Sequence, residues 1–380
     1  MQNRERNQET NFDNFSNFER DIDPKQRAWI EVRGESIQSN VRKLKSLLKK
    51  NCELMAVVKA DGYGHDALVV SKYAIKGGAS QLGVATLNEG IKLRLSGLKT
   101  PILVLGNLHT KRDLITCFKN DLMPTISSFR ECLICNNIGK HFGIKFALHL
   151  KVDTGMSRLG FDYDQFAGQF KKIKEFENIS IRGLYSHLSS ADEKNALEEN
   201  SITQLQKRKF THLLNQISIV DDTNIKIHLS NSAGMSLAKD FHFDMVRIGL
   251  SIYGYNYIEN KNEKLSLQPA LFLKVKVTFI RYIDKGVGVS YGSKFVSCRK
   301  TKLAVLSIGY ADGINRNLSG KINVLYKNKL YPQVGSITMD QMMVDITNSN
   351  DIKVGSTMIL LGSDGDKTIS PLDWARESNT

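Results

Sequence analysis

A lysine stands where a buried strand is expected to end, within the segment Ala56-Val-Val-Lys-Ala-Asp-Gly-Tyr-Gly-His65. The residues from Met55 to Val58 are all apolar, as in a strand that is covered on both faces. Two glycines follow Lys59 within five residues, and glycine lets the backbone turn sharply and approach a ligand closely. A lysine in this position can act as a Schiff-base nucleophile. The plainer alternative is a charged side chain with which the strand reaches water.

Other residue types that carry chemistry follow later apolar runs in the same relative position. They are Asp153-Thr-Gly-Met-Ser-Arg158-Leu-Gly, Ser186-His187, Ser230-Asn231-Ser232-Ala-Gly and Arg247-Ile-Gly249-Leu250. Ser232 and the amides after it open an expected helix, where free N–H groups and the helix dipole favour an anion. The alternative is an ordinary serine N-cap. Gly249 would offer further backbone amides nearby.

Eight strand-like runs must position these residues. They are Leu54–Val58, Leu82–Ala85, Ile102–Leu105, Leu122–Ile126, Lys145–Val152, Ile179–Tyr185, Ile225–Leu229 and Phe243–Ile248. Helix-like stretches separate most of them, among them Ser36–Leu48, Ala67–Lys76, Asn88–Ser96, Ser128–Ile138 and Ala196–Ser218. This alternation predicts an α/β fold, a (β/α)8 TIM-type barrel. Function in such barrels collects at the C-terminal ends of the strands, and phosphate is often held after the seventh and eighth.

The pattern changes after about residue 265, which predicts a second, mostly β domain. Its strand-like runs are Leu271–Ile280, Leu303–Ile308, Ile322–Tyr326, Gln333–Ile337, Met342–Ile346 and Met358–Leu361. A polar stretch from Tyr257 to Leu267 is the expected linker. We therefore expect a disordered leader over residues 1–26, the barrel over 27–262 and the β domain over 263–380.

Composition excludes several classes of protein. The net charge of +14 comes from lysines spread along the chain, and no nucleic-acid motif accompanies them, so no nucleic-acid partner is expected. There is no apolar run of membrane-spanning length and no signal peptide. Five irregularly spaced cysteines argue against a disulfide framework and for the cytoplasm. Cys132-x-x-Cys135 has no second pair, so no metal site is expected.

The segment around Lys59 resembles the pyridoxal-phosphate attachment segment of alanine racemases. Further motifs resemble that family in its order, over roughly residues 27–372. They are Lys151-Val-Asp-Thr-Gly-Met-Ser-Arg-Leu-Gly160, Tyr185-Ser-His187, Asn231-Ser232-Ala, Met245-Val-Arg-Ile-Gly249, Val289-Ser-Tyr-Gly292, Ile308-Gly-Tyr-Ala-Asp-Gly313 and Thr338-Met-Asp-Gln341. The resemblance implies a barrel followed by a β domain, as the pattern of elements also indicates.

The resemblance also implies roles for single residues around the cofactor. Lys59 would hold pyridoxal 5'-phosphate covalently and act as the base on the D-face of the substrate. Arg247 would face the pyridine nitrogen and, because arginine stays protonated, keep that nitrogen unprotonated. The remaining cofactor-binding set would be Tyr63, His187, Asn231, Ser232, Gly249 and Leu250, with Tyr63, Ser232 and the backbone of Gly249 and Leu250 at the phosphate.

Further implied roles concern the substrate and a second chain. Tyr291 of the partner subunit would be the base on the L-face, so the resemblance implies a homodimer with shared active sites. Arg158, assisted by the backbone of Met339, would bind the substrate carboxylate. Tyr310 would line the way into the site. Lys151 matches the lysine that is carbamylated in many relatives, where it orients the counterpart of Arg158.

The sequence leaves alternatives open. A decarboxylase of the same barrel type would place an acidic residue against the pyridine nitrogen, where this chain offers Arg247. A non-catalytic pyridoxal-phosphate carrier would be a lone barrel, without the β domain and Tyr291. The chain stops at Thr380, whereas relatives continue with a segment that supplies one more tyrosine. A truncated β domain, and with it a weakened or inactive relative that binds pyridoxal phosphate, is therefore also open.

Together these residues and the resemblance that they carry predict a cytoplasmic, homodimeric, pyridoxal-phosphate-dependent racemase. It would interconvert L-alanine and D-alanine by a two-base mechanism and supply D-alanine for peptidoglycan.

Overall fold

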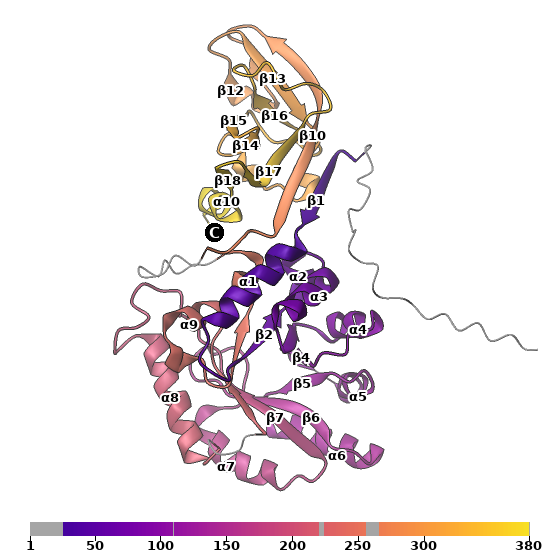
Figure 1. Ribbon diagram of the computed structural model, residues 1–380, viewed down its shortest axis with the longest axis vertical. Helices are drawn as coiled ribbons and strands as arrows, with labels where there is room; N and C mark the ends of the chain where they lie inside the picture. Colours follow the sequence, from indigo (N-terminus) through magenta and orange to yellow (C-terminus); the bar gives the residue numbers. More distant parts are fainter. Residues whose placement is uncertain (1–25, 109, 220–223, 256–265, 380) are drawn as a thin grey trace, which may run out of the picture. The chain divides into compact units, whose positions relative to one another are not determined.

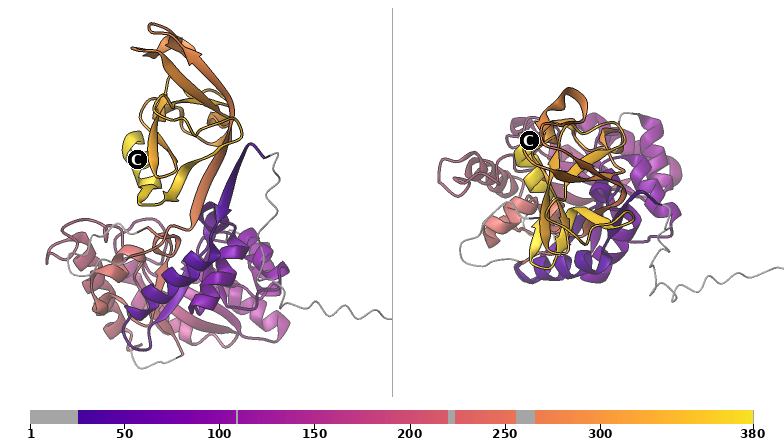
Figure 2. Two further views of the ribbon diagram at one scale, coloured as in Figure 1. Left: turned by 45° about the horizontal axis from the view of Figure 1, so that its top comes forward. Right: turned by 90° about the horizontal axis from the view of Figure 1, so that it is seen from above.

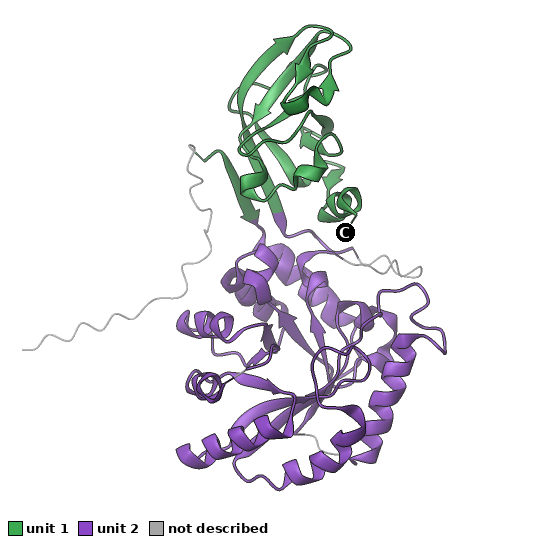
Figure 3. Ribbon diagram, turned by 180° about the vertical axis from the view of Figure 1, so that it is seen from behind, with its two compact units in different colours: residues 1–31, 272–380 green, residues 32–271 purple. Residues whose placement is uncertain are grey.

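The computed structural model describes residues 26–108, 110–219, 224–255 and 266–379. Nearly all of the expected leader and most of the expected linker lie outside these residues. The chain divides into two compact units, which are coloured separately in Figure 3. One unit is Val32–Leu271, and the other is Phe272–Thr380 together with the residues up to Glu31.

The first unit is built on a closed barrel of eight parallel strands, which confirms the predicted fold class. The strands are β2 (Glu53–Val57), β3 (Gln81–Val84), β4 (Ile102–Val104), β5 (Met123–Ile126), β6 (Phe146–Lys151), β7 (Ile179–Tyr185), β8 (Lys226–His228) and β9 (Met245–Ile248). Pairing of β2 with β9, with Leu54 opposite Val246, closes the ring. Each strand lies within two residues of its predicted bounds.

Helices lie around the outside of this ring in Figures 1 and 2. They are α1 (Gly34–Ser46), α2 (Lys59–Gly64), α3 (Ala67–Gly77), α4 (Leu87–Leu95), α5 (Lys111–Lys119), α6 (Phe129–Phe142), α7 (Tyr163–Lys174), α8 (Ile202–Gln216) and α9 (Ser232–Leu237). Side-chain caps fix where several of them begin. The Thr86 hydroxyl accepts from the Glu89 amide at α4, and the Ser201 hydroxyl accepts from Gln204 at α8. The predicted start of α8 at Ala196 is therefore wrong by six residues.

Two layers of packing hold the barrel unit together. The larger hydrophobic core lies between strands and helices and includes Val58, Leu82, Val104 and Phe166, all fully buried. A smaller cluster of Met55, Leu103, Tyr185 and Met245 joins side chains from four of the barrel strands. Polar residues of the barrel strands, among them His149, His228 and Arg247, are also buried. Since a buried polar group must find a partner, their hydrogen bonds decide what the barrel can do.

The second unit is an eight-stranded sheet in the order β1-β10-β13-β16-β15-β14-β17-β18. Its strands are β1 (Ala28–Val32), β10 (Leu271–Ile283), β13 (Thr301–Leu306), β14 (Asn323–Tyr326), β15 (Lys329–Val334), β16 (Met342–Asp345), β17 (Thr357–Asp364) and β18 (Lys367–Ile369). A separate pair, β11 (Gly288–Val289) and β12 (Phe295–Val296), and one helix, α10 (Pro371–Ser378), complete it.

The division of the chain differs from the predicted one at both boundaries. β1 lies beside β10 in the sheet, the backbone amide of Lys276 donates to the carbonyl of Arg27 (2.8 Å), and Glu31 forms an ion pair with Lys274. Residues 27–31 therefore belong to the mostly β unit and not to the barrel. A strand's sequence shows that it needs a partner but not which one, because apolar alternation is the same in either sheet. The other boundary lies at Leu271 instead of residue 262.

Within the described ranges, no helix is long and apolar enough to cross a membrane.

Candidate active site

Lys59 leaves the end of β2 and begins an unusual turn. The four residues from Ala60 to Tyr63 all have left-handed helical dihedrals, with φ between 51° and 63°. Such a conformation costs roughly 1–2 kcal/mol for each residue other than glycine, and Gly62 is the only glycine among the four. Two carboxylates hold the turn, one from α4 and one from the turn itself. The Ala60 amide donates to Glu89 Oε1 of α4 (2.8 Å), and Asp61 accepts from the first amide of α3 (3.0 Å).

The turn places Tyr63 beside Ser232 and Gly249, which come from the last part of the barrel sequence. The Gly249 amide donates to the Ser232 hydroxyl (3.1 Å). A side chain at position 249 would place its Cβ 2.6 Å from the Tyr63 hydroxyl oxygen, so any residue other than glycine would displace the end of the Tyr63 side chain. The Tyr63 ring also packs on Tyr253, with 4.8 Å between the centroids. Tyr63, Ser232 and Gly249 therefore form one small cradle, which we call the hydroxyl cradle.

Asn231, not Ser232, caps the short helix α9. Its side-chain oxygen accepts from the Gly234 amide (2.9 Å). The alternative that Ser232 is an ordinary N-cap is therefore wrong, and its hydroxyl is engaged with Gly249 across the barrel end. That hydroxyl accepts one hydrogen bond and still carries its own proton, which suits an anionic ligand. Leu250 lies next to Gly249, is half-buried and begins a 3₁₀ turn, Leu250–Tyr253.

Arg247 is the buried centre of the site, with 3% of its surface exposed. The two hydrogens of its Nη2 are shared among three acceptors, the carbonyls of Ser186 and Leu229 (both 2.8 Å) and His187 Nδ1 (3.1 Å), while Nη1 donates to His228 Nδ1 (2.8 Å). None of these partners is a carboxylate. Burial lowers the pKa of Arg247 to about 10, so the guanidinium still carries its charge at neutral pH. None of these bonds uses Nε.

His187 is held neutral beside this charge. Burial first, and then the positive charges of Arg247, Lys151, Arg158 and Lys59, lower its pKa to about 2. All four cations thus lie close enough to His187 to act on it, although they come from three different strands or the turns after them, β2, β6 and β9. Because Nδ1 accepts from Arg247, the single proton of His187 is on Nε2.

Lys151 ends β6 and is buried, with its ammonium nitrogen 5.6 Å from the centre of the Tyr185 ring. Burial, together with Arg247 and Arg158, lowers its pKa to about 8, and Asp153 opposes that shift. The Asp153 carboxylate is largely engaged with the amides of the following turn, Gly155 (2.9 Å) and Met156 (2.8 Å). The strand ends therefore gather more positive than negative charge, which suits an anionic ligand.

Three further predicted residues gather in the mostly β unit. The Ser336 hydroxyl donates to the Tyr291 carbonyl (2.9 Å), while the Tyr310 amide donates to the carbonyl of Thr338 (3.0 Å), which is followed by Met339. Tyr291 is 71% exposed, Met339 53% and Tyr310 41%. All three side chains are exposed, and these hydrogen bonds tie their backbones to the same segment, residues 336–339, although Tyr291 and Met339 are 48 positions apart.

Pyridoxal phosphate suits the residues of the barrel unit. The hydroxyl cradle offers a tyrosine and a serine hydroxyl to a phosphate, and Lys59 supplies an amine at the end of the neighbouring strand. Arg247 keeps Nε for a ring acceptor and has no acidic partner among the described residues. A decarboxylase-like acidic residue is absent from this position.

Several residues that support the site were not predicted. Glu89 holds the Lys59 turn, and His149, His228 and Tyr185 lie beneath Arg247. A signal for His149 existed, since it alternates with Lys151 along one strand and residues two apart share a face. No local pattern marked Glu89, because its second carboxylate oxygen forms an ordinary capping box with Thr86.

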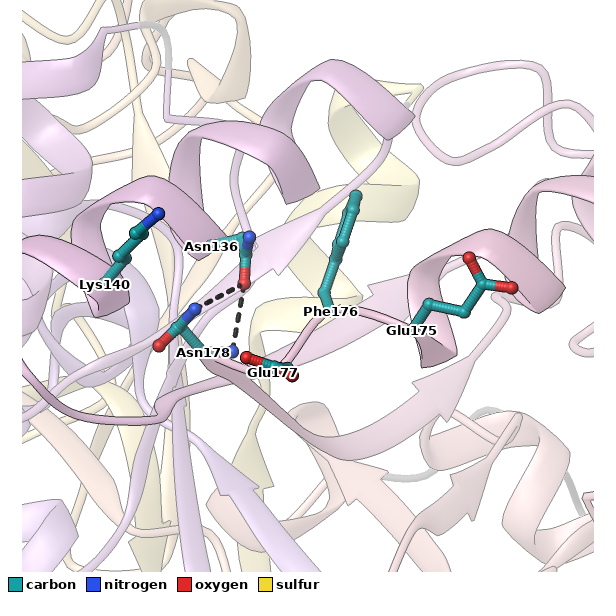
Figure 4. Close-up of a pocket in the computed structure, with 6 residues that line it drawn as sticks. All are labelled: Asn136, Lys140, Glu175, Phe176, Glu177 and Asn178. Atoms are coloured by element: carbon teal, nitrogen blue, oxygen red, sulfur yellow. Dashed lines mark hydrogen bonds between the residues drawn. The ribbon is translucent and has the colours of Figure 1, made fainter.

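A hollow at another place on the barrel unit contains none of these residues. Figure 4 shows it between α6 and the connection that precedes β7, where Asn136 accepts from the backbone and side chain of Asn178 (3.0 and 3.3 Å). It lies before the N-terminal end of β7, whereas the candidate residues follow the C-terminal ends of the strands.

Comparisons with known proteins show the family to which the chain belongs. The chain matches the family models "Alanine racemase, N-terminal domain" over residues 32–257 and "Alanine racemase, C-terminal domain" over residues 270–380. It is 50% identical to the alanine racemase of Prochlorococcus marinus over 359 residues, 94% of this chain and 93% of that relative.

Solved structures are similar over the same extent. Alanine racemase of Clostridium difficile 630 matches with a TM-score of 0.84 and 33% identity, over 93% of this chain and 91% of that one. Alanine racemase of Bartonella henselae, with covalently bound pyridoxal phosphate, matches with a TM-score of 0.81 and 28% identity, over 93% and 95%. The chain therefore belongs to the alanine racemase family and is an isomerase that acts on amino acids.

Proposed function

We propose that this chain interconverts L-alanine and D-alanine with pyridoxal phosphate bound at Lys59, and that the D-alanine serves peptidoglycan synthesis. The observation that carries the proposal is the convergence of Lys59, the hydroxyl cradle and a buried Arg247 without a carboxylate partner at one end of the barrel. When bound, pyridoxal phosphate withdraws electrons from the amino acid and makes its Cα–H bond acidic.

Holding the cofactor is the task of residues from several strand ends. Tyr63, Ser232 and the backbone at Gly249 and Leu250 would bind the phosphate, with Asn231 fixing the start of α9. Arg247 Nε would donate to the pyridine nitrogen. Because a guanidinium does not give up its proton in this range, the ring nitrogen would stay unprotonated and drain less charge, which disfavours side reactions.

Racemisation needs one base on each face of the substrate, because the proton leaves one face and returns on the other. We assign the Lys59 amine to the D-face and the hydroxyl of Tyr291 of the partner subunit to the L-face. The exposure of Tyr291, Tyr310 and Met339 together on the mostly β unit supports their contribution to another chain's site. His187 would link Tyr291 of the partner subunit to Arg247 through its Nε2–H.

Arg158 would bind the substrate carboxylate, with the backbone of Met339 assisting and Tyr310 lining the access path. We propose that Lys151 is carbamylated. Its pKa of about 8 leaves part of the amine neutral near pH 7, and only the neutral amine can attack carbon dioxide. The nitrogen–carbon bond forms as one C=O π bond opens and a proton leaves. The carbamate would set an anion beside Arg158 and hold it in place.

We place the protein, as a homodimer, in the cytoplasm. All five cysteines are free thiols, and four of them are buried, which suits a reducing compartment. The homodimer follows from the shared site, since one chain would supply Lys59 and the other Tyr291.

The test is D-alanine formation from L-alanine by the purified full chain with added pyridoxal phosphate, with the cofactor's absorbance recorded alongside. Turnover in both directions is expected. A bound-cofactor spectrum without turnover would overturn the racemase assignment and leave the inactive relative. Turnover without any need for pyridoxal phosphate would overturn the cofactor assignment.

A further inference from the structure

His149 lies beneath His228, which is one of the two histidines that accept a hydrogen bond from Arg247. His228 Nε2 and His149 Nδ1 are 3.0 Å apart, and both rings are fully buried. The two residues come from β8 and β6, and Tyr185 of β7, the strand between them, stacks on the His228 ring at 4.5 Å and 9°. The guanidinium of Arg247 lies over the same Tyr185 ring, with its carbon 4.9 Å from the ring centre. Arg247, His228 and His149 thus form a continuous buried chain, which we call the imidazole chain.

The direction of each hydrogen bond in the imidazole chain follows from elementary chemistry. A guanidinium only donates, so His228 Nδ1 must accept from Arg247 Nη1. Burial and the charge of Arg247 lower the pKa of His149 to about 3 and that of His228 well below its ordinary value, so each ring carries one proton. The His228 proton is therefore on Nε2. That N–H donates to His149 Nδ1, which leaves the His149 proton on Nε2.

While Arg247 is charged, only one arrangement of protons satisfies both hydrogen bonds of the imidazole chain, and it leaves the buried Nε2–H of His149 without a partner among the described residues. If His149 instead donated from Nδ1, His228 would have to accept at Nε2 and carry its proton on Nδ1, against the Arg247 N–H. Two N–H donors whose nitrogens are 2.8 Å apart in a buried site repel each other, and both stay without an acceptor. The free-energy cost is larger than that of a hydrogen bond lost at the surface.

The backbone beside His149 is shaped to admit its ring. Gly183 lies opposite His149 across β6 and β7, and a Cβ on Gly183 would come within 2.4 Å of His149 Nδ1. Any other residue at 183 would displace the nitrogen that accepts from His228. The same strand thus provides the space for His149 and the Tyr185 ring that stacks on His228.

We infer that His149 is a positioning residue for Arg247: by accepting the Nε2–H of His228, it holds His228 in the tautomer that receives the guanidinium. His149 touches neither the substrate nor the proposed cofactor residues other than through His228. Its effect on the tautomer concerns this chain alone, whereas its effect on catalysis rests on the proposed function.

The first experiment measures the tautomers directly. Histidine labelled with 15N is incorporated into the full chain, and long-range proton–nitrogen correlation spectra identify which nitrogen of each ring is protonated. Spectra of single-histidine variants assign the signals. Both His149 and His228 are expected to be neutral and protonated on Nε2. A wild-type spectrum with either proton on Nδ1 would overturn the inference, and this arm needs no catalytic activity.

The second experiment compares His149→Asn with His149→Leu. The two side chains are similar in size and remove the same ring volume, but the asparagine oxygen lies near the former Nδ1 and can accept from His228. The leucine variant is expected to disturb the His228 tautomer and to lower kcat roughly tenfold, with KM for alanine near wild type. The scale is that seen when a metal-ligating histidine loses the hydrogen-bond partner of its other ring nitrogen. The asparagine variant should retain the tautomer and most of kcat.

Equal losses in both variants would show that only packing is at stake and would overturn the inference. An unchanged His228 signal in the leucine variant would do the same. If the wild-type chain does not racemise alanine at all, the proposed function fails, but the tautomer measurements on wild type and variants still decide the role of His149.

Discussion

The histidines of this site are neutral, whereas Arg247 beside them is charged. His187 and His149 have pKa values of about 2 and 3 because they are buried beside Arg247, so they stay neutral and can accept as well as donate. Arg247 keeps its charge under the same burial because its ordinary pKa is far higher. The site thus combines a permanent cation with neutral, directional partners. Lys151, whose pKa falls to about 8, is mostly charged at neutral pH but has a neutral fraction as well.

Replacement of Lys59 tests the covalent attachment. Lys59→Ala should abolish trapping of pyridoxal phosphate by borohydride, because Lys59 is the lysine at the end of β2 beside the hydroxyl cradle. The modified peptide of the wild-type chain, identified by mass spectrometry, should contain Lys59. Lys119→Ala, which removes an exposed lysine from the last turn of α5, is the matched control and should trap the cofactor normally. A modified peptide that lacks Lys59 would contradict the assignment.

The amount of carbamate on Lys151 should depend on pH. Its neutral fraction rises as pH increases through about 8, so at a fixed pressure of carbon dioxide its carbamate should increase from pH 7 to pH 9. With 13C-labelled carbon dioxide, a carbamate carbon signal should grow over this range in wild type and vanish in Lys151→Met. The exposed Lys145→Met is the control and should leave the signal in place. Absence of the signal from wild type at pH 9 would refute carbamylation.

Among the elements, the barrel could be predicted and the left-handed turn could not. The strands alternate with helices in a regular apolar pattern, and that pattern follows directly from burial on both faces. The turn from Ala60 to Tyr63 has ordinary residues in a costly conformation, which tertiary contacts impose. The pairing of β1 with β10 is likewise a tertiary fact. β15 was predicted four residues late because the tight turn at Lys327 and Asn328, both with positive φ, carries no glycine.

The left-handed turn depends on Glu89 of α4, whose carboxylate accepts from the amides of Ala60, Ala85 and Thr86. Glu89→Ala should lower the free energy of unfolding by about 1–3 kcal/mol, since these amides lose their acceptor. It should also weaken pyridoxal phosphate binding, because the turn carries Lys59 and Tyr63. Denaturant unfolding and a cofactor titration measure the two effects.

Glu131 is the matched control for this element. It stands at the third position of α6, as Glu89 does in α4, and its carboxylate accepts from the Ser127 amide (2.7 Å), but none of its hydrogen bonds reaches the Lys59 turn. Glu131→Ala should lower stability by about 1 kcal/mol through the lost cap and leave cofactor binding unchanged. If both variants weaken cofactor binding equally, the turn is not what Glu89 supports.

At the scale of the whole molecule, the candidate residues divide between two units. Lys59, Arg158 and Arg247 belong to the barrel unit, whereas Tyr291, Tyr310 and Met339 belong to the mostly β unit. The resemblance of the sequence motifs indicated this division, and the structure adds that the second group is exposed together. The proposed homodimer with shared sites would explain why Tyr291, a residue proposed as a base, is exposed on its own unit.

Mixing two inactive variants tests this sharing. Lys59→Ala chains keep Tyr291, and Tyr291→Phe chains keep Lys59. In an equal mixture with free exchange, half of the dimers are mixed, and each mixed dimer has one complete site and one that lacks both bases. About one quarter of wild-type activity should therefore return, as the two-fold symmetry of a dimer requires. The assay is D-alanine formation after exchange, with mixed dimers confirmed by differently tagged chains.

The double variant with Lys59→Ala and Tyr291→Phe on the same chain is the control for that experiment. Mixed equally with wild-type chains, it produces mixed dimers in which each site lacks one base, so activity should fall to about one quarter of that of an undiluted wild-type sample. If each chain instead holds a complete site of its own, one half remains and the two single variants fail to complement each other. The two mixtures thus move in opposite directions under the two arrangements, which separates a shared site from an independent one without any assumption about how the units are placed.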